Sequence, residues 1–525
     1  MVYAYGIDLG TTYSCIARAN EKREVEVLKN KEGKEITPSV VEFESMTKIA
    51  VGETAKGSVI INSENIVQYI KRWMGKSDYR FTYQGVKFTP EEISAFILKK
   101  LVQDAELVTR EKITDVVITV PAYFGFDERQ ATINAGKIAG LNVLDIVNEP
   151  SAAAIAYSNR SANKQDKLVL VYDLGGGTFD ITVAEIIGDR VEVVCSTGDQ
   201  NLGGKDWDTD LADYVISEFC AKTDASQDAV LEDLDFYSGL MLKVEEAKIM
   251  LSGKDSTKIP LSMGAKKAQI EVTKAKFNEL TRGRLLTTIN LTKKVIESAA
   301  EKTSSKGKHC NKFDEIIFVG GSTRMTQVED EIIKEFGMKP VVFDPDLAVA
   351  KGAALLAQYI LSDPSYKRGD STGGTFEAGN SKFGEVTSKS YGVQALDRNS
   401  KLMLFNVTMK NTKIPCSDTG NFFTLEDDQR LVDVIIYESD SEKDICELSF
   451  GKEINRSELH LPSGLPKGAP IDATFSIDTS GMLTVTAVEK TYGTRCEIKT
   501  KIKGLDANEV THLQQKAASM RIGDA

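Results

Sequence analysis

The sequence predicts an α/β region over residues 1–360, followed by an antiparallel β-sandwich over 388–503. Three observations support this division. Strand-like apolar runs alternate with helical patterns in the first part, which is typical of α/β folds. Residues 361–387 are rich in Ser, Gly, Lys and Thr and predict an exposed linker. Short alternating segments separated by turn residues then follow.

In the α/β region, three apolar runs predict buried strands and one capping signal predicts a helix. The runs are DVVITV (115–120), LVLVYDL (168–174) and EIIFVGG (315–321). The helix signal is the tetrapeptide 89–92, Thr-Pro-Glu-Glu, a capping box with proline at the first helical position. The apolar rhythm of ISAFILKKLV follows it.

Two stretches of this region share one pattern. YGIDLGTTYSCIA (5–17) and VYDLGGGTFDITVA (171–184) each run a strand into Asp-Leu-Gly, a Gly/Thr turn and a second strand. Glycine turns let backbone N–H groups converge on an anion, and Asp8 and Asp173 offer carboxylate oxygens for Mg²⁺, usually through waters. One such hairpin alone is equally well an ordinary β-turn. Two of them predict a clamp for a polyphosphate and its metal.

After residue 388, five alternating segments predict the sandwich, and residues 506–520 predict a short helix. The segments are LMLFNVTM (402–409), VDVIIY (432–437), IDATFSI (471–477), MLTVTAV (482–488) and CEIKTKI (496–502).

The composition limits the possible functions. A net charge of −12 argues against general nucleic-acid binding. No apolar run approaches the roughly 20 residues of a membrane span, and the N-terminus lacks a signal-peptide pattern. The seven cysteines are scattered without a CxxC pair, and there are only three histidines. Reduced cysteines and a cytoplasmic location are therefore expected, and a zinc cage or histidine catalysis is not.

Taken together, these motifs resemble the heat-shock protein 70 (DnaK-like) chaperone family. The matching segments are YGIDLGTTYSCIA, VITVPAYF (117–124), NEPSAAAIAY (148–157), VYDLGGGTFDITV, NLGGKDWD (201–208), FVGGSTRM (318–325) and DPDLAVAKGAAL (344–355). Weaker matches in the β-domain are NTKIP (411–415), TLEDDQ (424–429) and ATFSIDTSGMLTVTA (473–487). The resemblance implies an actin-like (ribonuclease H-like) two-lobed ATPase domain, a linker, a peptide-binding β-sandwich and, over 504–525, a short helical remnant of a lid.

The resemblance also implies a set of site residues. Asp8, Asp173 and Asp180 would hold Mg²⁺, with K⁺ as a further candidate ion. Lys71 and Thr178 would lie near the γ-phosphate of ATP, and Glu149 and Asp173 would orient the attacking water. The remaining nucleotide-binding residues would be Gly10, Thr11, Thr12, Tyr13, Gly175, Gly176, Gly177, Gly203, Gly204, Glu245, Lys248, Ser252, Gly320, Gly321, Ser322, Arg324 and Asp346. Without the resemblance, Lys71 and the Glu245–Ser252 face would be read as solvated charges.

Seven apolar residues of the β-domain match the family's peptide cleft. They are Val393, Leu396, Phe422, Leu425, Val432, Val434 and Ile471. An extended apolar peptide would be held there by backbone hydrogen bonds and side-chain pockets. The alternative for each is plain core packing, because alternating apolar residues normally face inward.

Several positions depart from the family pattern. Ile249 stands where an arginine usually stacks on adenine, which predicts weaker nucleotide binding. Lys205 replaces an acidic residue. Asp145 reverses a basic charge that meets the J-domain partner, so a generic J-domain is expected to stimulate poorly. No helical lid follows the β-domain in this sequence.

The linker also departs from the family, because 361–387 lacks a leucine-rich run. This predicts weak coupling between ATP and peptide. The alternative is that Phe383 and Val386 dock on the ATPase lobes by themselves. Pro121 and Arg129 would take part in the interdomain switch.

These features predict an ATP-dependent chaperone that hydrolyses ATP to ADP and phosphate and binds unfolded polypeptides. A J-domain co-chaperone and a nucleotide exchange factor are candidate partners; nucleic acid and membranes are not. Two alternatives stay open: a small-molecule kinase or phosphohydrolase of the actin-like superfamily with an accessory β-domain, and a filament-forming actin-like protein.

Overall fold

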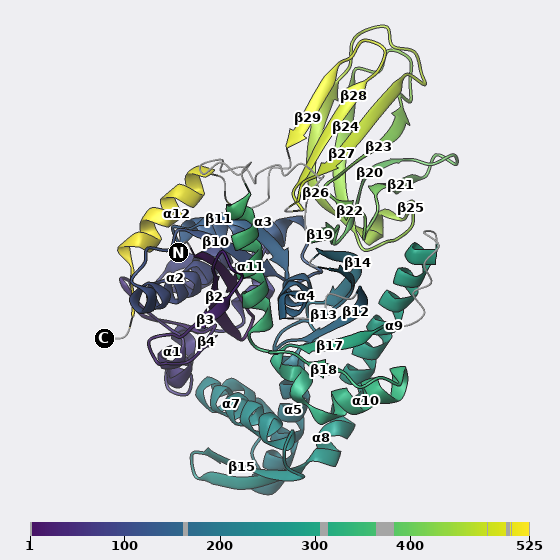
Figure 1. Ribbon diagram of the computed structural model, residues 1–525. Coiled ribbons are helices and arrows are strands. Elements are labelled where there is room, and N and C mark those ends of the chain that lie inside the picture. The colour runs from purple at the N-terminus through teal and green to yellow at the C-terminus, as the bar shows by residue number, and fades with distance from the viewer. Residues whose placement is uncertain are drawn as a thin grey trace.

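The computed structural model describes residues 3–160, 166–188, 190–304, 313–363, 383–479, 481–499, 505 and 507–523. It contains an α/β part with two large sheets, from which a β-domain projects (Figure 1). The predicted succession of α/β region and antiparallel β-domain is confirmed.

The first sheet of the α/β part has the strand order β11-β10-β1-β2-β3, with β4 paired to β2. Its elements are β1 (Ala4–Asp8), β2 (Tyr13–Ala19), β3 (Val25–Leu28), β4 (Thr37–Pro38), β10 (Asp115–Val120) and β11 (Asn142–Asn148). Helices α2 (Pro90–Thr109) and α3 (Phe126–Ile138) and a small sheet with β5 (Val41–Ser45), β6 (Lys48–Val51) and β7 (Ile66–Val67) belong to the same lobe. Every residue of β10 is buried, and Thr89 caps α2 in the predicted capping box, so both predictions are confirmed.

The second sheet has the order β18-β17-β12-β13-β14-β19-β22. Its strands are β12 (Lys167–Leu174), β13 (Phe179–Ile187), β14 (Arg190–Asp199), β17 (Glu315–Val319), β18 (Val341–Val342), β19 (Phe383–Val386) and β22 (Lys413–Ile414). Helices α5 (Gly204–Thr223), α7 (Leu234–Leu251) and α9 (Arg282–Ser304) belong to this lobe. So do α8 (Lys274–Leu280), α10 (Thr326–Phe336) and the hairpin of β15 (Ser256–Met263) and β16 (Lys266–Thr273). The apolar runs at 168–174 and 315–319 are strands as predicted.

Two helices join the sheets of the two lobes. They are α4 (Glu149–Arg160) and α11 (Ala348–Ser362), and one buried cluster links them to strands of both sheets. The helices approach closely because small residues face each other. A Cβ on Gly352 would lie 1.8 Å from the backbone oxygen of Ala152, and one on Gly6 would lie 2.1 Å from the nitrogen of Ala354.

The β-domain has two sheets, with strand orders β25-β21-β20-β24-β26 and β23-β27-β28-β29. The strands are β20 (Ser390–Leu396), β21 (Leu402–Thr408), β23 (Cys416–Phe423), β24 (Leu431–Ser439), β25 (Ile445–Cys446), β26 (Gly451–His460), β27 (Pro470–Ile477), β28 (Leu483–Glu489) and β29 (Arg495–Lys499). All pairings within this domain are antiparallel, and alternate residues of its strands form one core.

The prediction of an exposed linker is wrong for its last residues. Strand β19 pairs in parallel with β14 and antiparallel with β22, so it extends the second sheet of the α/β part. Val386 is buried, and the ring of Phe383 packs edge-on against Tyr359 of α11. Residues 364–382 lie outside the described residues.

The predicted C-terminal helix is present as α12 (Ala507–Ser519), and it packs on the first lobe beside α2 and α3 (Figure 1). Lys516 donates to Glu92 at 2.6 Å, and Lys99 donates to the backbone oxygen of Ala517 at 2.5 Å. Val510 and Met520 join the core of that lobe. In this structure, the helix therefore lies away from the β-domain.

Candidate functional site

The two glycine–threonine hairpins face each other across the lobes. A Cβ on Gly176 would lie 2.0 Å from the Thr12 hydroxyl oxygen, and one on Gly177 would lie 2.3 Å from the Thr11 methyl group. Neither glycine has a positive φ. Glycine is required here because the opposite hairpin approaches so closely, rather than for a left-handed turn.

Between the hairpins lies a cavity of about 450 Å³. Most of the predicted site residues line it: Asp8, Gly10, Thr11, Thr12, Tyr13, Lys71, Glu149, Asp173, Gly175, Gly176, Gly177, Thr178, Glu245, Lys248, Ser252, Gly320, Gly321, Ser322, Arg324 and Asp346. These residues come from both hairpins, from the 3₁₀ helix η2 (Ile70–Trp73), from α4 and the C-terminal end of α7, and from the turns after β17 and before α11. Elements distant in the sequence thus converge on one cavity of a volume suited to a nucleotide.

Three predicted site residues lie behind the cavity wall instead of lining it. The backbone N–H of Gly204 donates to Gly175 O at 2.9 Å. A Cβ on Gly203 would lie 2.4 Å from the carbonyl carbon of Gly177. Asp180 pairs with Asp173 across the second hairpin and accepts a hydrogen bond from the backbone N–H of Ala122 at 2.9 Å. These residues therefore support the glycine turn from behind.

The floor of the cavity and the layer directly behind it concentrate negative charge. Burial, reinforced by the Glu149 carboxylate, raises the pKa of Asp8 to about 7 and holds the pKa of Asp173 well above its usual range. The same causes raise the pKa of Asp180. The ammonium group of Lys71 forms a buried ion pair with Glu149, and Thr119 donates to Asp8 Oδ1 at 3.0 Å. One lysine does not offset four carboxylates.

This charge excess fits a bound divalent cation. The Oδ2 atom of Asp180 is buried without a hydrogen-bond partner. Among the described residues, no three Asp, Glu, His or Cys side chains are grouped closely enough to hold a metal ion directly. Both observations agree with a Mg²⁺ ion that the carboxylates would hold through its bound waters, which is usual for this ion.

The opposite side of the cavity carries ordered ion pairs. Lys56 donates to Glu245 at 2.9 Å and to the hydroxyl of Tyr13 at 2.8 Å, which joins α7 to the first hairpin. Lys248 donates to Asp208 at 2.7 Å. Ile249 also lines the cavity, although its side chain is 63% exposed. An aliphatic side chain therefore borders the cavity beside Lys248.

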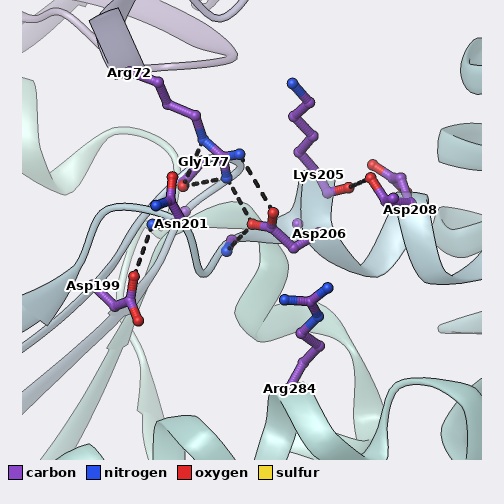
Figure 2. A network of polar contacts seen from close by, with 12 residues as sticks. Arg72, Gly177, Asp199, Asn201, Lys205, Asp206, Asp208 and Arg284 are labelled. Atoms are coloured by element: carbon purple, nitrogen blue, oxygen red, sulfur yellow. Dashed lines mark hydrogen bonds and ion pairs between the residues drawn. The ribbon is translucent and has the colours of Figure 1, made fainter. Parts of the chain in front are cut away.

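A second cross-lobe contact was not predicted (Figure 2). Arg72, in the 3₁₀ helix η2 (Ile70–Trp73) of the first lobe, donates to Gly177 O and to Asp206 Oδ2, both at 2.6 Å. Lys56, Asp206 and Asp208 were missed as well, because the partners in these ion pairs are far apart in the sequence and leave no local pattern. Arg72 thus connects the two lobes at the second glycine turn.

The structure divides the predicted peptide-binding residues into two groups. Val393, Val434 and Ile471 are buried in the core of the β-domain, and Phe422 and Val432 pack partly against it. Leu396 and Leu425 are 39% and 52% exposed. Core packing accounts for the first three in this structure, whereas the other four remain accessible for a peptide.

The β-domain contacts the first lobe through several polar side chains. Ser388 donates to Phe124 O at 2.7 Å, and Lys452 bridges Asp127 at 2.9 Å and Glu438 at 3.1 Å. Arg129 is buried, bonds to Asn148 and faces Gly481 of the β-domain. Arg129 therefore lies at the junction between the domains.

A cavity with two facing glycine–threonine hairpins and a carboxylate floor is typical of proteins that bind a polyphosphate between two lobes. The protein family described as Hsp70 protein matches residues 4–525, which include the β-domain and α12. The chain therefore belongs to the Hsp70 family. Proteins of this family are chaperones and ATPases that use a nucleotide and Mg²⁺. Within the described residues, no helix is both long and apolar enough to span a membrane.

Proposed function

We propose that this protein is an ATP-dependent chaperone that binds extended apolar segments of unfolded polypeptides and regulates this binding by hydrolysing ATP to ADP and phosphate. The observation that carries the proposal is the pair of facing glycine–threonine hairpins above the carboxylate floor. The match to one family over both domains favours a chaperone over a kinase or filament protein with an accessory domain.

In the proposed reaction, water attacks the γ-phosphorus and ADP leaves. Backbone N–H groups of the two turns bind the phosphate oxygens, and Lys71 offsets the charge that develops on them. Glu149 and Asp173 orient the water and accept its proton, for which their burial near one another is suitable. Asp8, Asp173 and Asp180 would hold Mg²⁺, which supplies charge neutralisation when bound, and K⁺ is a further candidate ion.

The adenosine moiety is proposed to lie between α7 and the turn after β17. Glu245, Lys248 and Ser252 line one side of the cavity there, and Gly320, Gly321, Ser322, Arg324 and Asp346 line it as well. Arg324 donates to Asp346 at 2.6 Å, which closes this end of the cavity. Ile249 would contact the base by dispersion alone.

The β-domain is proposed to hold the client peptide through its accessible apolar residues, Leu396, Phe422, Leu425 and Val432. A J-domain co-chaperone and a nucleotide exchange factor are proposed partners, as is usual in this family. A cytoplasmic site of action is also proposed, because the seven cysteines are scattered along the sequence without a CxxC pair.

The proposed ATPase is tested with Asp8→Asn and Thr178→Ala. Both changes are expected to reduce Mg²⁺-dependent phosphate release by at least about 100-fold, because charge stabilisation at the phosphates dominates this chemistry. The exposed change Lys222→Met, on the far end of α5, serves as the control. Turnover at the wild-type rate in both variants would remove the site assignment.

A further inference from the structure

One basic side chain of the cavity differs from the others in lacking a counter-ion. Five basic residues in or beside the cavity form ion pairs: Lys56 with Glu245, Lys71 with Glu149, Arg72 with Asp206, Lys248 with Asp208 and Arg324 with Asp346. Lys205 also lines the cavity, but its ammonium group contacts no carboxylate in the part of the chain that the structure describes. Among the described residues, Lys205 is therefore the basic side chain of the cavity that has no ion-pair partner.

The position of Lys205 connects it to the phosphate-binding elements. Its backbone N–H donates to Gly176 O at 2.7 Å, so the residue is joined directly to the second glycine turn. Its ammonium group lies over the ring of Tyr69, 4.1 Å from the centroid. Tyr69 comes two residues before Lys71 and lines the same cavity. The charge therefore lies between the two sides of the proposed phosphate site.

The acidic residue next to Lys205 in the sequence has other partners. Asp206, the next residue, binds Arg72 at 2.6 Å and the backbone N–H of Gly203 at 2.8 Å. Figure 2 shows the Lys205 side chain extending away from the Arg72–Asp206 pair. Burial lowers the pKa of Lys205, the charge of Arg72 adds to this effect, and the Asp206 carboxylate opposes it only in part. Both observations indicate that a bound anion would stabilise the charged form of the Lys205 ammonium group.

We infer that Lys205 binds the phosphate chain of the nucleotide and determines the preference of this cavity for phosphorylated ligands over the bare nucleoside. Lys205 is half-buried, and an ionised oxygen at hydrogen-bond distance would stabilise its ammonium group. No carboxylate among the described residues supplies such an oxygen. The inference rests on the proposed nucleotide site. It assigns a role to a lysine that stands where the family has an acidic residue.

The test compares binding of ADP and adenosine to the full-length chain by isothermal titration calorimetry. Lys205→Met keeps the apolar stem over Tyr69 and removes the charge. We expect it to weaken ADP about tenfold, and adenosine less than twofold. Lys205→Arg is expected to keep most of the ADP affinity, and Lys222→Met on the same helix is expected to change neither ligand.

Three outcomes would overturn the inference. Unchanged ADP affinity in Lys205→Met would show that the ammonium makes no contact with phosphate. Equal losses for ADP and adenosine would assign Lys205 to holding the lobes together through Tyr69. Loss of ADP affinity in Lys205→Arg that equals the loss in Lys205→Met would show that charge is not the cause. If the wild-type chain binds neither ligand, the proposed function itself fails, which is a separate result.

Discussion

At the scale of single residues, the three glycines between Leu174 and Thr178 show what the sequence can and cannot predict. The sequence indicates a turn there, but it does not show why three glycines are needed. In the sequence, three successive glycines indicate either a tight bend or a close approach of another group to the backbone. The structure shows that Thr11 and Thr12 of the other hairpin approach Gly176 and Gly177. In a strand interior, each of these glycines would destabilise the fold by about 0.5–1 kcal/mol relative to alanine. Their presence is explained by contact between the hairpins.

Asp145 is a second residue whose environment has a measurable consequence. Burial raises its pKa to about 7, and the carboxylates of Asp478 and Glu385 contribute to the rise. The backbone N–H of Ile146 and the guanidinium of Arg129 oppose it. The charge reversal seen in the sequence therefore places an acid beside other acids at the domain junction.

Asp145→Asn is expected to stabilise the protein at pH 8. A carboxyl whose folded-state pKa is raised contributes stability below its ordinary pKa of about 4, and this contribution is lost as the pH rises through about 7. The neutral amide avoids that loss. Because Asp145 is partly exposed, we expect a gain on the order of 1–2 kcal/mol at pH 8, shrinking towards pH 5.

Thermal unfolding of both proteins at pH 5 and pH 8 measures this difference. An exposed acid on α6 (Gln227–Glu232) supplies the control, Glu232→Gln, which should show no such trend. A stability difference between Asp145→Asn and the wild type that is the same at both pH values would contradict the prediction.

At the scale of elements, the predictable parts were those encoded locally. The capping box of α2, the buried runs of β10 and β12, and the alternation in β24 are each readable within about ten residues. The paired hairpins were predictable because the pattern occurs twice. The ion pair between Lys71 and Glu149 was not readable from spacing, because it joins residues 78 positions apart, and only the family resemblance placed both there.

Strand β19 was missed for a different reason. Its residues, Phe-Gly-Glu-Val, follow a long polar stretch and carry no alternation. The segment forms a strand because the open edge of β14 supplies hydrogen-bond partners, which is a property of the assembled sheet. The docking of Phe383 and Val386 supports the alternative in which the linker couples the domains despite its composition.

Within the β-domain, Val432→Phe tests whether β24 borders the peptide site. Val432 packs only partly against the core, so a larger ring is expected to occupy the accessible side. We expect affinity for a leucine-rich peptide to fall about tenfold, with ATP turnover in the absence of peptide unchanged. Fluorescence anisotropy measures the affinity, and Val342→Phe at an exposed position of β18 is the control. Unaltered peptide binding in a folded variant would place Val432 outside the site.

At the scale of the whole molecule, the domains are connected through a shared sheet. The β-domain enters this sheet through β19 and β22, and Lys452 and Ser388 bind the first lobe. A contact that differs between two domain arrangements is what allows a ligand of one domain to affect the other. β19 is the best-placed candidate for this role.

Val386→Asp is expected to uncouple ATP from peptide release. A carboxylate at this buried position disfavours docking, and coupling energies of allosteric proteins correspond to about 5- to 150-fold effects. We therefore expect ATP to accelerate release of a fluorescent peptide at least about fivefold in the wild type, and by less than twofold in the variant. Val342→Asp controls for an added charge on the second sheet. If ATP leaves the wild-type release rate unchanged, the result supports the weak coupling that the polar composition of the linker predicts.

The packing of α12 on the first lobe has one further consequence. The chain leaves the α/β part after α11, builds the β-domain and returns to the first lobe at α12. The β-domain is therefore connected covalently to the α/β part at both of its ends. A domain held in this way, once separated from the lobes, stays at a high effective concentration near them, and diluting the protein does not lower it. Re-docking of the β-domain is therefore a search within one molecule, and the two covalent connections limit how far the domain can move from the cavity between the lobes.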